Sequence, residues 1–216
     1  NEVIMVSGSD MHGAPITVSA DKEKVPPETI ANRYHAMNTK AIADLGIEFD
    51  LYTSTHTRNH EVVTQDVFNR LLEKGHLEKK ATPQFYCESC KRFLPDRYVE
   101  GRCPHCGYER ARGDQCDNCG KDLNAEQLVD AKCQLCGGVP ELRETEHYFL
   151  KLSDFREQLV KYVEPQNHWR PHVRAFTLNV LKEGLADRPI TRDITWGVPV
   201  PVDGFESKRI YVWFDA

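Results

Sequence analysis

The chain has 216 residues, a formal net charge of −5 at pH 7, 40% hydrophobic residues and 28% charged residues. Its length suits one domain with a smaller second one, and its balance of apolar and charged residues excludes a disordered or a membrane-embedded chain. No apolar run is long enough to cross a bilayer, no signal peptide is present, and the total charge does not indicate nucleic-acid binding. A strand-like start at Asn1 and an abrupt end at Ala216 indicate a piece of a longer protein.

Strand and helix signals alternate in the first 80 or so residues. Residues 2–6 are an apolar run with β-branched side chains and predict a buried strand, which the polar turn 7–10 ends. Residues 49–54 predict a second strand. A helix follows each strand, and this order predicts an α/β fold with a parallel sheet and helices on its faces.

The two helices of this part have clear boundary signals. The first is expected between Pro27 and Gly46, and the second between a cap at Thr57 or Asn59 and a stop at Gly75. Helical periodicity predicts an inward face for each, made of Ile30, Tyr34, Met37, Ala41 and Leu45 in the first and of Val63, Val67 and Leu71 in the second.

The segment after residue 146 continues with extended and helical signals. Residues 147–152 predict a strand, and residues 171–184 predict a helix. A helix between them is expected to be capped by Ser153 and to end before Pro165, with inward side chains from Phe155, Leu159 and Val163. The extended, aromatic tail predicts two final strands, at residues 190–201 and 209–216.

The eight cysteines form four C-x-x-C pairs in a Gly-, Asp- and Arg-rich segment: Cys87/Cys90, Cys103/Cys106, Cys116/Cys119 and Cys133/Cys136. Without a secretion signal, this spacing is typical of metal-binding thiolates in a reducing compartment, so we expect a cytoplasmic protein. The change of composition at this segment indicates an insertion into a different kind of domain.

Zinc takes four ligands in a tetrahedron, and one C-x-x-C turn supplies two sulfur atoms. Gly107, Gly120 and Gly137 directly follow three of the pairs, where they allow the backbone to turn its amides toward the thiolates. Four pairs suffice for two sites. Four thiolates leave no position for a catalytic water, so the predicted role is structural, with redox dithiols as the alternative.

Spacing alone permits two pairings of the knuckles. In the sequential arrangement the first two pairs share one ion and the last two share the other. In the nested arrangement the two inner pairs share one ion and the two outer pairs share the other. The loop lengths of the sequential arrangement are closer to those of common zinc ribbons.

Three segments outside the insertion carry candidate functional residues. Asp10 and His12 follow the first strand, at the sheet edge where ligands bind, although a helix cap and local packing are the simpler explanation. Arg192 precedes a tryptophan and two prolines, where a surface ion pair is the alternative. Trp213, taken by itself, predicts a buried position in a core strand.

Five segments, read together, match one family. They are S-G-S-D-M-H-G at 7–13, F-L-P-D-R-Y-V-E-G-R-C-P-H-C-G at 93–107, G-D-Q-C-D-N-C-G at 113–120, R-D-I-T-W-G-V-P-V-P at 192–201 and Y-V-W-F-D-A at 211–216. The first and the last two resemble G-T-D-E-H-G, R-D-x-x-W-G-I-P-V-P and Y-V-W-F/L-D/E-A of methionyl-tRNA synthetases. The cysteine-containing segments resemble the zinc-bearing connective peptide of that family. The resemblance covers essentially the whole chain in the right order.

The resemblance implies a class I catalytic domain, which is a Rossmann-type fold split by an inserted connective peptide. In that family methionine and ATP, with magnesium, form methionyl-adenylate, and the methionyl group then passes to tRNA(Met). Asp10 would hold the α-ammonium of methionine, and Arg192 would pair with Asp10 and organise the adenylate site. Trp213 would line the methionine pocket, and His12 would bind substrate or have a structural role.

The resemblance also implies a domain organisation and a metal pairing. Residues 1–81 and 147–216 would be two truncated parts of the catalytic domain, with residues 82–146 as the connective peptide. Some family members keep only the inner and others only the outer cysteines, so the resemblance favours nesting. The inner set would be Cys103, Cys106, Cys116 and Cys119, and the outer set Cys87, Cys90, Cys133 and Cys136.

Two class I signatures are absent from residues 1–216: H-x-G-H, which should precede them, and K-M-S-K-S, which should follow. Both act on the phosphates of ATP, so we expect this chain alone to be inactive. The insertion is too short for the hydrolytic domain of the isoleucyl, valyl and leucyl enzymes, so we expect a covering or tRNA-guiding role.

Three rival interpretations explain fewer of these features. A stand-alone zinc-ribbon adaptor accounts for the cysteines but not for the flanking motifs. A rubredoxin-like iron site accounts only for C-P-H-C-G. Another class I synthetase is disfavoured by the paired knuckles and the short insertion. No membrane partner is expected, and the sequence does not predict an oligomeric state.

Overall fold

The computed structural model of the protein describes residues 2–216, apart from the side chain of Asp96. Its first part contains β1 (Val6–Ser9), α1 (Ala14–Glu23), α2 (Pro27–Asp44), β2 (Leu51–Ser54) and α3 (Arg58–Glu73). The middle part contains β3 (Leu77–Cys87), β4 (Arg92–Phe93), β5 (Val99–Arg102), β6 (Ala111–Arg112), β7 (Val129–Cys133) and β8 (Glu141–Leu150). The last part contains α4 (Arg156–Val163), α5 (Pro171–Glu183), β9 (Arg188–Pro189), β10 (Thr191–Arg192), β11 (Arg209–Ile210) and α6 (Val212–Asp215).

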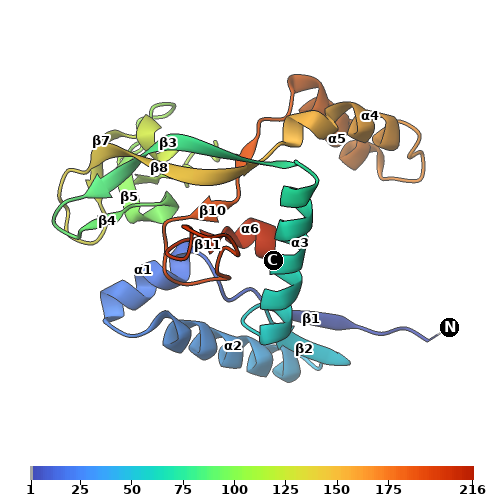
Figure 1. The fold of residues 1–216 in the computed structure, drawn as a ribbon. Helices are drawn as coiled ribbons and strands as arrows, with labels where there is room; N and C mark the ends of the chain where they lie inside the picture. Colours follow the sequence, from blue (N-terminus) through green and yellow to red (C-terminus); the bar gives the residue numbers. More distant parts are fainter. Residues whose placement is uncertain (1) are drawn as a thin grey trace.

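The parallel pairing of β1 with β2 confirms the α/β class. Val6 lies opposite Leu51, and Ser9 lies opposite Ser54. The helix α2 lies beside both strands (Figure 1), and the ring of His35 stacks on Tyr52 at a centroid distance of 5.6 Å. The predicted strand at 2–6 is wrong in position and burial. The strand begins only at Val6, and residues 3–6 are exposed because no described element covers them.

The long helices have the predicted boundaries but different buried faces. Thr57 caps α3, since its hydroxyl oxygen accepts a hydrogen bond from the backbone N–H of His60 at 3.2 Å. Of the predicted α2 face only Ile30 is buried. In α3 the buried residues are Thr64 and Phe68, whereas the expected Val63 and Val67 are exposed. Apolar residues occur on several sides of α3, so periodicity alone does not decide which side is covered.

The helix α1 is not predicted from the sequence, and several expectations for the last part are wrong. Ser153 does not cap α4, because its hydroxyl donates to Asp187 Oδ1 at 2.7 Å and a 3₁₀ turn precedes the helix. The final strand over 209–216 is replaced by β11 and α6, since the N–H groups of Phe214 and Asp215 both donate to the carbonyl of Tyr211. Trp213 on this turn is 79% exposed rather than buried.

The antiparallel hairpin of β3 and β8 is the longest pairing in the described structure. It extends from Leu77 opposite Leu150 to Tyr86 opposite Glu141. Figure 1 shows it running from the cysteine-rich segment at one end to α4 and α5 at the other. Ala81 lies opposite Glu146, so the two predicted domain boundaries, after residue 81 and after residue 146, fall at the same position along this hairpin. The division into 1–81, 82–146 and 147–216 stays a prediction.

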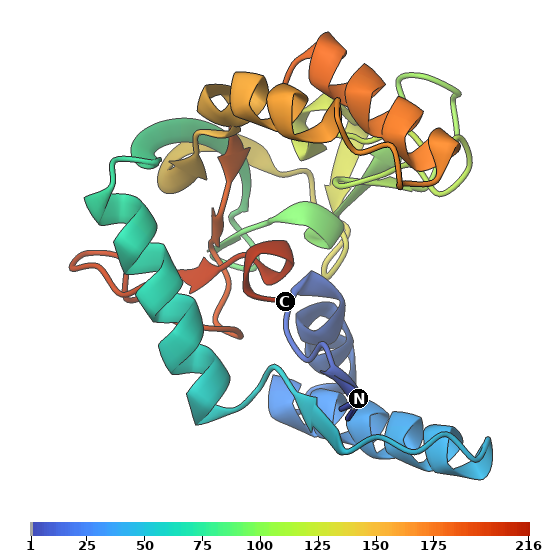
Figure 2. The same ribbon diagram turned by 90° about the vertical axis from the view of Figure 1, so that its right-hand side faces the viewer.

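Two groups of buried residues form the core. One surrounds the cysteines and includes Ala14 and Val18 of α1, and the other joins α3, the hairpin and the C-terminal segment around Phe68 and Tyr148. Figure 2 shows α3 and the C-terminal segment side by side. Among the described residues, no helix is both long and apolar enough to cross a membrane.

Phe68→Ala should lower the free energy of unfolding by about 3–5 kcal/mol, because its ring is fully buried against Tyr148 and Phe214. The matched change Val67→Ala, at a side chain that is 43% exposed, should cost less than about 1 kcal/mol. Urea denaturation of both variants measures the difference. Equal losses would contradict the observed orientation of α3.

Candidate active site and metal centres

The eight cysteines lie in two groups of four, and within each group the sulfur atoms are within 4.8 Å of one another. The inner group is Cys103, Cys106, Cys116 and Cys119, and the outer group is Cys87, Cys90, Cys133 and Cys136. These groups confirm the nested pairing and exclude the sequential one.

The distances between sulfur atoms fit a tetrahedral metal ion. Four sulfur atoms at about 2.3 Å from zinc lie about 3.8 Å from one another in a tetrahedron. The measured separations are 3.5 Å for Cys87–Cys136, 3.8 Å for Cys90–Cys133, 3.6 Å for Cys106–Cys116 and 3.9 Å for Cys103–Cys119. Each group therefore fits one structural zinc ion, with no ligand position left for water.

Each knuckle turn has a left-handed residue directly after its second cysteine. Gly107, Gly120 and Gly137 have φ angles of 74°, 69° and 74°, and each donates its N–H to the carbonyl of the first cysteine of its turn. Lys91 takes this place in the remaining turn with a φ of 51°. Backbone amides approach two of the sulfur atoms at 3.4 Å, as expected for thiolate ligands.

Three motif segments that are far apart in the sequence meet at the carboxyl end of β1. His12 Nδ1 lies 2.7 Å from Asp215 Oδ2, and both side chains are buried. The indole N–H of Trp196 donates to the carbonyl of Met11 at 2.7 Å. The segments 7–13, 192–201 and 211–216 are therefore in direct contact.

Two histidines that follow β2 complete the cluster around His12. His12 Nε2 lies 3.3 Å from His56 Nδ1, and the ring of His60 is 6.3 Å from that of His12. The His56 ring lies 4.3 Å from the ring of Trp196. Sequence reasoning missed His56, His60 and Asp215. The available signal for the two histidines was their position after the second parallel strand, at the same sheet edge as His12.

Asp10 lies at the border of this cluster. The backbone N–H of His12 donates to Asp10 Oδ1 at 3.3 Å. The Asp10 side chain keeps contact with solvent. Nevertheless, partial loss of solvation raises the pKa of Asp10 above its ordinary value, and the nearby Asp215 carboxylate adds to this, against the hydrogen bond from His12.

The structure does not pair Asp10 with Arg192, which corrects the sequence-based expectation. Among the described residues, Asp10 has no hydrogen bond or ion pair with Arg192. Arg192 donates to the carbonyls of Pro189 and Thr191 at 2.9 and 3.0 Å, and its guanidinium carbon lies 3.7 Å from the ring centre of Tyr211. Arg192 lies on β10, and its side chain stacks on Tyr211, the residue after β11, the strand that pairs with β10.

Arg192 and Trp213 line a hollow of about 1000 Å³ below the hairpin. Tyr211 and residues 122–127, which follow the last cysteine of the inner group, also line it. Asp10 and His12 are not among the described residues that line it. The candidate substrate residues thus lie in two places, one beside the His12 cluster and one in the hollow.

Comparison with known proteins places this arrangement in a family. A family model described as tRNA synthetases class I (M) matches residues 1–216. Methionine–tRNA ligases of Thermomicrobium roseum, Dehalococcoides mccartyi and Thermoplasma volcanium are 55%, 57% and 50% identical over the whole chain. The chain belongs to the methionyl-tRNA synthetases of class I. It spans 37–40% of the length of these relatives.

The fold of this chain agrees with a solved structure. The crystal structure of Mycobacterium tuberculosis methionyl-tRNA synthetase bound by methionyl-adenylate matches with a TM-score of 0.68 and 22% sequence identity. The match covers 99% of this chain and 38% of that chain. It confirms the class I catalytic fold that the motifs imply.

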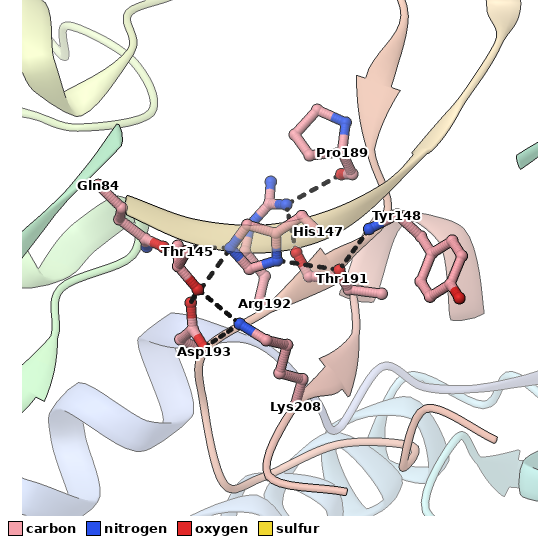
Figure 3. Close-up of polar contacts among 9 residues, drawn as sticks. All are labelled: Gln84, Thr145, His147, Tyr148, Pro189, Thr191, Arg192, Asp193 and Lys208. Atoms are coloured by element: carbon pink, nitrogen blue, oxygen red, sulfur yellow. Dashed lines mark hydrogen bonds and ion pairs between the residues drawn. The ribbon is translucent and has the colours of Figure 1, made fainter. Parts of the chain in front are cut away.

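A second polar cluster of this chain joins the hairpin to β10, and sequence reasoning missed it (Figure 3). Its side chains come from β3, β8, β10 and the segments beside β10 and β11: Gln84, Thr145, His147, Thr191, Asp193 and Lys208. Burial lowers the pKa of His147 below its ordinary value. Burial opposes the ionisation of Asp193, but hydrogen bonds from His147 and Lys208 outweigh it and lower its pKa.

The nested groups predict the metal content of paired cysteine variants. The variant C103S/C116S disrupts only the inner site and should keep one of two ions per chain, whereas C87S/C103S disrupts both sites and should keep none. A sequential pairing predicts the reverse for both variants. Native mass spectrometry counts the ions, elemental analysis identifies them, and retention of the opposite numbers would contradict the nested sites.

Stability should depend on the protonation of His147. Because its pKa is lowered in the folded state, the unfolded state binds more protons, and the contribution of His147 is lost as the pH falls below about 6.5. This loss in the free energy of unfolding is at most about 1.4 kcal/mol per pH unit, and the variant H147Q should not show it. Urea denaturation at pH 7.5 and 5.5 measures it. Asp193 stays ionised over this interval, and equal slopes for both proteins would contradict the assignment.

Proposed function

We propose that the full-length protein containing this chain is a cytoplasmic methionine–tRNA ligase. It would form methionyl-adenylate and pyrophosphate from methionine and ATP with magnesium, and then transfer the methionyl group to tRNA(Met). The contact between the three motif segments around His12, Asp215 and Trp196 carries this proposal. It brings the family's substrate motifs together at the sheet edge where α/β proteins bind ligands.

Asp10 is the proposed ligand of the methionine α-ammonium. Partial loss of solvation makes its carboxylate favour neutralisation, which raises its pKa. A bound ammonium group neutralises it equally well through a charge-assisted hydrogen bond. His12, held by Asp215, donates its backbone N–H to Asp10 and so fixes the carboxylate. This geometry favours a positioning role for His12 in the proposed site.

Arg192 and Trp213 are proposed to bind the rest of the substrate. The guanidinium of Arg192, stacked on Tyr211, presents a fixed positive charge that suits the adenylate phosphate. The exposed indole of Trp213 offers an aromatic surface that suits the methionine thioether. Both residues line the hollow below the hairpin, so substrate binding there would bring them to one ligand.

The connective peptide, residues 82–146, is proposed to hold two structural zinc ions and to guide the tRNA acceptor end. Four-thiolate sites supply folding energy and no catalytic water. Tyr98 of this segment donates its hydroxyl to Asp21 of α1 at 2.7 Å, which docks the knuckles on the helix that follows His12. Residues 122–127 of the connective peptide line the hollow together with Arg192 and Trp213, and this proximity favours a guiding role.

Methionine-dependent exchange of pyrophosphate into ATP tests the proposed reaction in the full-length protein. We expect exchange with methionine and none with isoleucine. Asp10→Asn should lower kcat/KM for methionine about 10- to 100-fold, the loss of one charge-assisted hydrogen bond. Asp44→Asn, on the exposed end of α2, is the matched control and should leave it unchanged.

Exchange that depends on another amino acid, or no exchange at all, would refute the proposal. Residues 1–216 by themselves lack both ATP-binding signatures, so no exchange is expected from them.

A further inference from the structure

One imidazole ring bridges the two residues on either side of Arg192. His147 Nδ1 lies 2.9 Å from Thr191 Oγ1, and His147 Nε2 lies 3.1 Å from Asp193 Oδ2 (Figure 3). His147 is on β8 of the hairpin and is 3% exposed. The hairpin therefore contacts both neighbours of Arg192 through a single buried side chain.

This bridge constrains where the Arg192 side chain points. Successive side chains of an extended segment point to opposite faces, so fixing Thr191 and Asp193 toward β8 turns Arg192 to the other face. There its guanidinium stacks on Tyr211 and donates to the carbonyls of Pro189 and Thr191. Any rotation of the segment would have to break both contacts of His147.

Lys208 is a further partner of Asp193, and it lies on the segment that leads to Tyr211. Its ammonium donates to Asp193 Oδ1 and to Thr145 Oγ1, and it directly precedes β11. The strand β11 pairs with β10, with Thr191 opposite Ile210, and Tyr211 follows. The strands β10 and β11, which carry the stacked pair of Arg192 and Tyr211, are thus both linked to one partly buried carboxylate, that of Asp193.

When His147 is neutral, the polar atoms of this cluster have hydrogen-bond partners. Nε2–H faces two acceptors, Gln84 Oε1 at 3.2 Å and Asp193 Oδ2, while Nδ1 accepts from the hydroxyl of Thr191. That hydroxyl oxygen also accepts the backbone N–H of Tyr148 at 3.1 Å. Lys208 neutralises Asp193. Replacing a buried ion pair by apolar side chains of similar volume is often neutral for stability, so the specific contribution that we assign to this cluster is orientation.

We propose that His147 is a positioning residue that sets the guanidinium of Arg192 for adenylate formation, with Asp193 and Lys208 as its partners. This inference rests on the proposed function. It links the hairpin that carries the zinc knuckles to a residue of the reaction centre, so movement of the hairpin would be transmitted to Arg192.

A double-mutant cycle in the full-length enzyme tests this role. The variants are H147Q, R192Q and the double variant, and kcat/KM for methionine is measured by pyrophosphate exchange. H147Q should lose about 10- to 100-fold, the effect of a displacement of about 1 Å at a reacting centre. If His147 acts through Arg192, the double variant should be no slower than R192Q alone. Losses that multiply would overturn the positioning role.

A second variant and a matched control keep the result decisive. T191V removes the hydroxyl group that His147 contacts but preserves the shape of the side chain. The double variant T191V/R192Q should have a kcat/KM no lower than that of R192Q alone. H76Q makes the same substitution at the α4 end of the hairpin, where the His76 ring lies 4.8 Å from that of Phe155. It should leave kcat/KM unchanged. Metal content and thermal midpoints verify folding of each variant.

The outcomes separate the two proposals. No exchange by the unsubstituted enzyme would refute the proposed function, and with it this role. Exchange by the unsubstituted enzyme together with multiplying losses in both cycles would refute only the positioning role of His147.

Discussion

The antiparallel pairing of β3 with β8 is the contact on which most of this structure depends. It joins segments that are far apart in the chain, and closing the long loop between them costs conformational entropy. The outer cysteine group closes the same loop, because Cys87 ends β3 while Cys133 and Cys136 precede β8. The hydrogen-bonded ladder and a metal ion held by the outer cysteine group would therefore offset the same entropy cost together.

Successive side chains of β8 point to opposite faces, so this strand contacts two different parts of the structure. Thr145 and His147 point to one face, where both contact Asp193. Tyr148 points to the other face, where its ring contacts Phe68 of α3 at a centroid distance of 5.5 Å. A single strand thus stabilises the apolar core and orients a polar segment, so a register shift by one residue would disrupt both.

The His147 cluster and the His12 cluster differ in whether their buried polar atoms have hydrogen-bond partners. The buried polar side chains of the His147 cluster have partners. In the His12 cluster, Asp215 Oδ1 and His60 Nε2 are buried without a hydrogen-bond partner among the described residues. An unsatisfied buried polar atom is costly, and a polar group from a ligand or from a part of the full-length protein outside residues 1–216 would remove that cost. The contrast fits a positioning unit in one place and a binding site in the other.

The sequence by itself determined the features that depend on local geometry. Thiolate spacing and the glycine turns specify two four-cysteine groups that fit metal ions, and helix signals specify α2 and α3 with the Thr57 cap. Motif content specified the family and the first candidate site residues, Asp10 and Arg192. These inferences hold because ligand spacing, capping and turn chemistry act within a few residues.

Only the tertiary structure decided what depends on contacts between distant segments. Phe68 rather than Val67 faces the core because the hairpin and α6 cover that side of α3. Asp215 reaches His12 because residues 212–215 turn into a helix where the apolar pattern favours a strand. His147 can position Arg192 only because β8 lies beside β10. No local pattern encodes such contacts, since they depend on which surfaces the complete fold brings together.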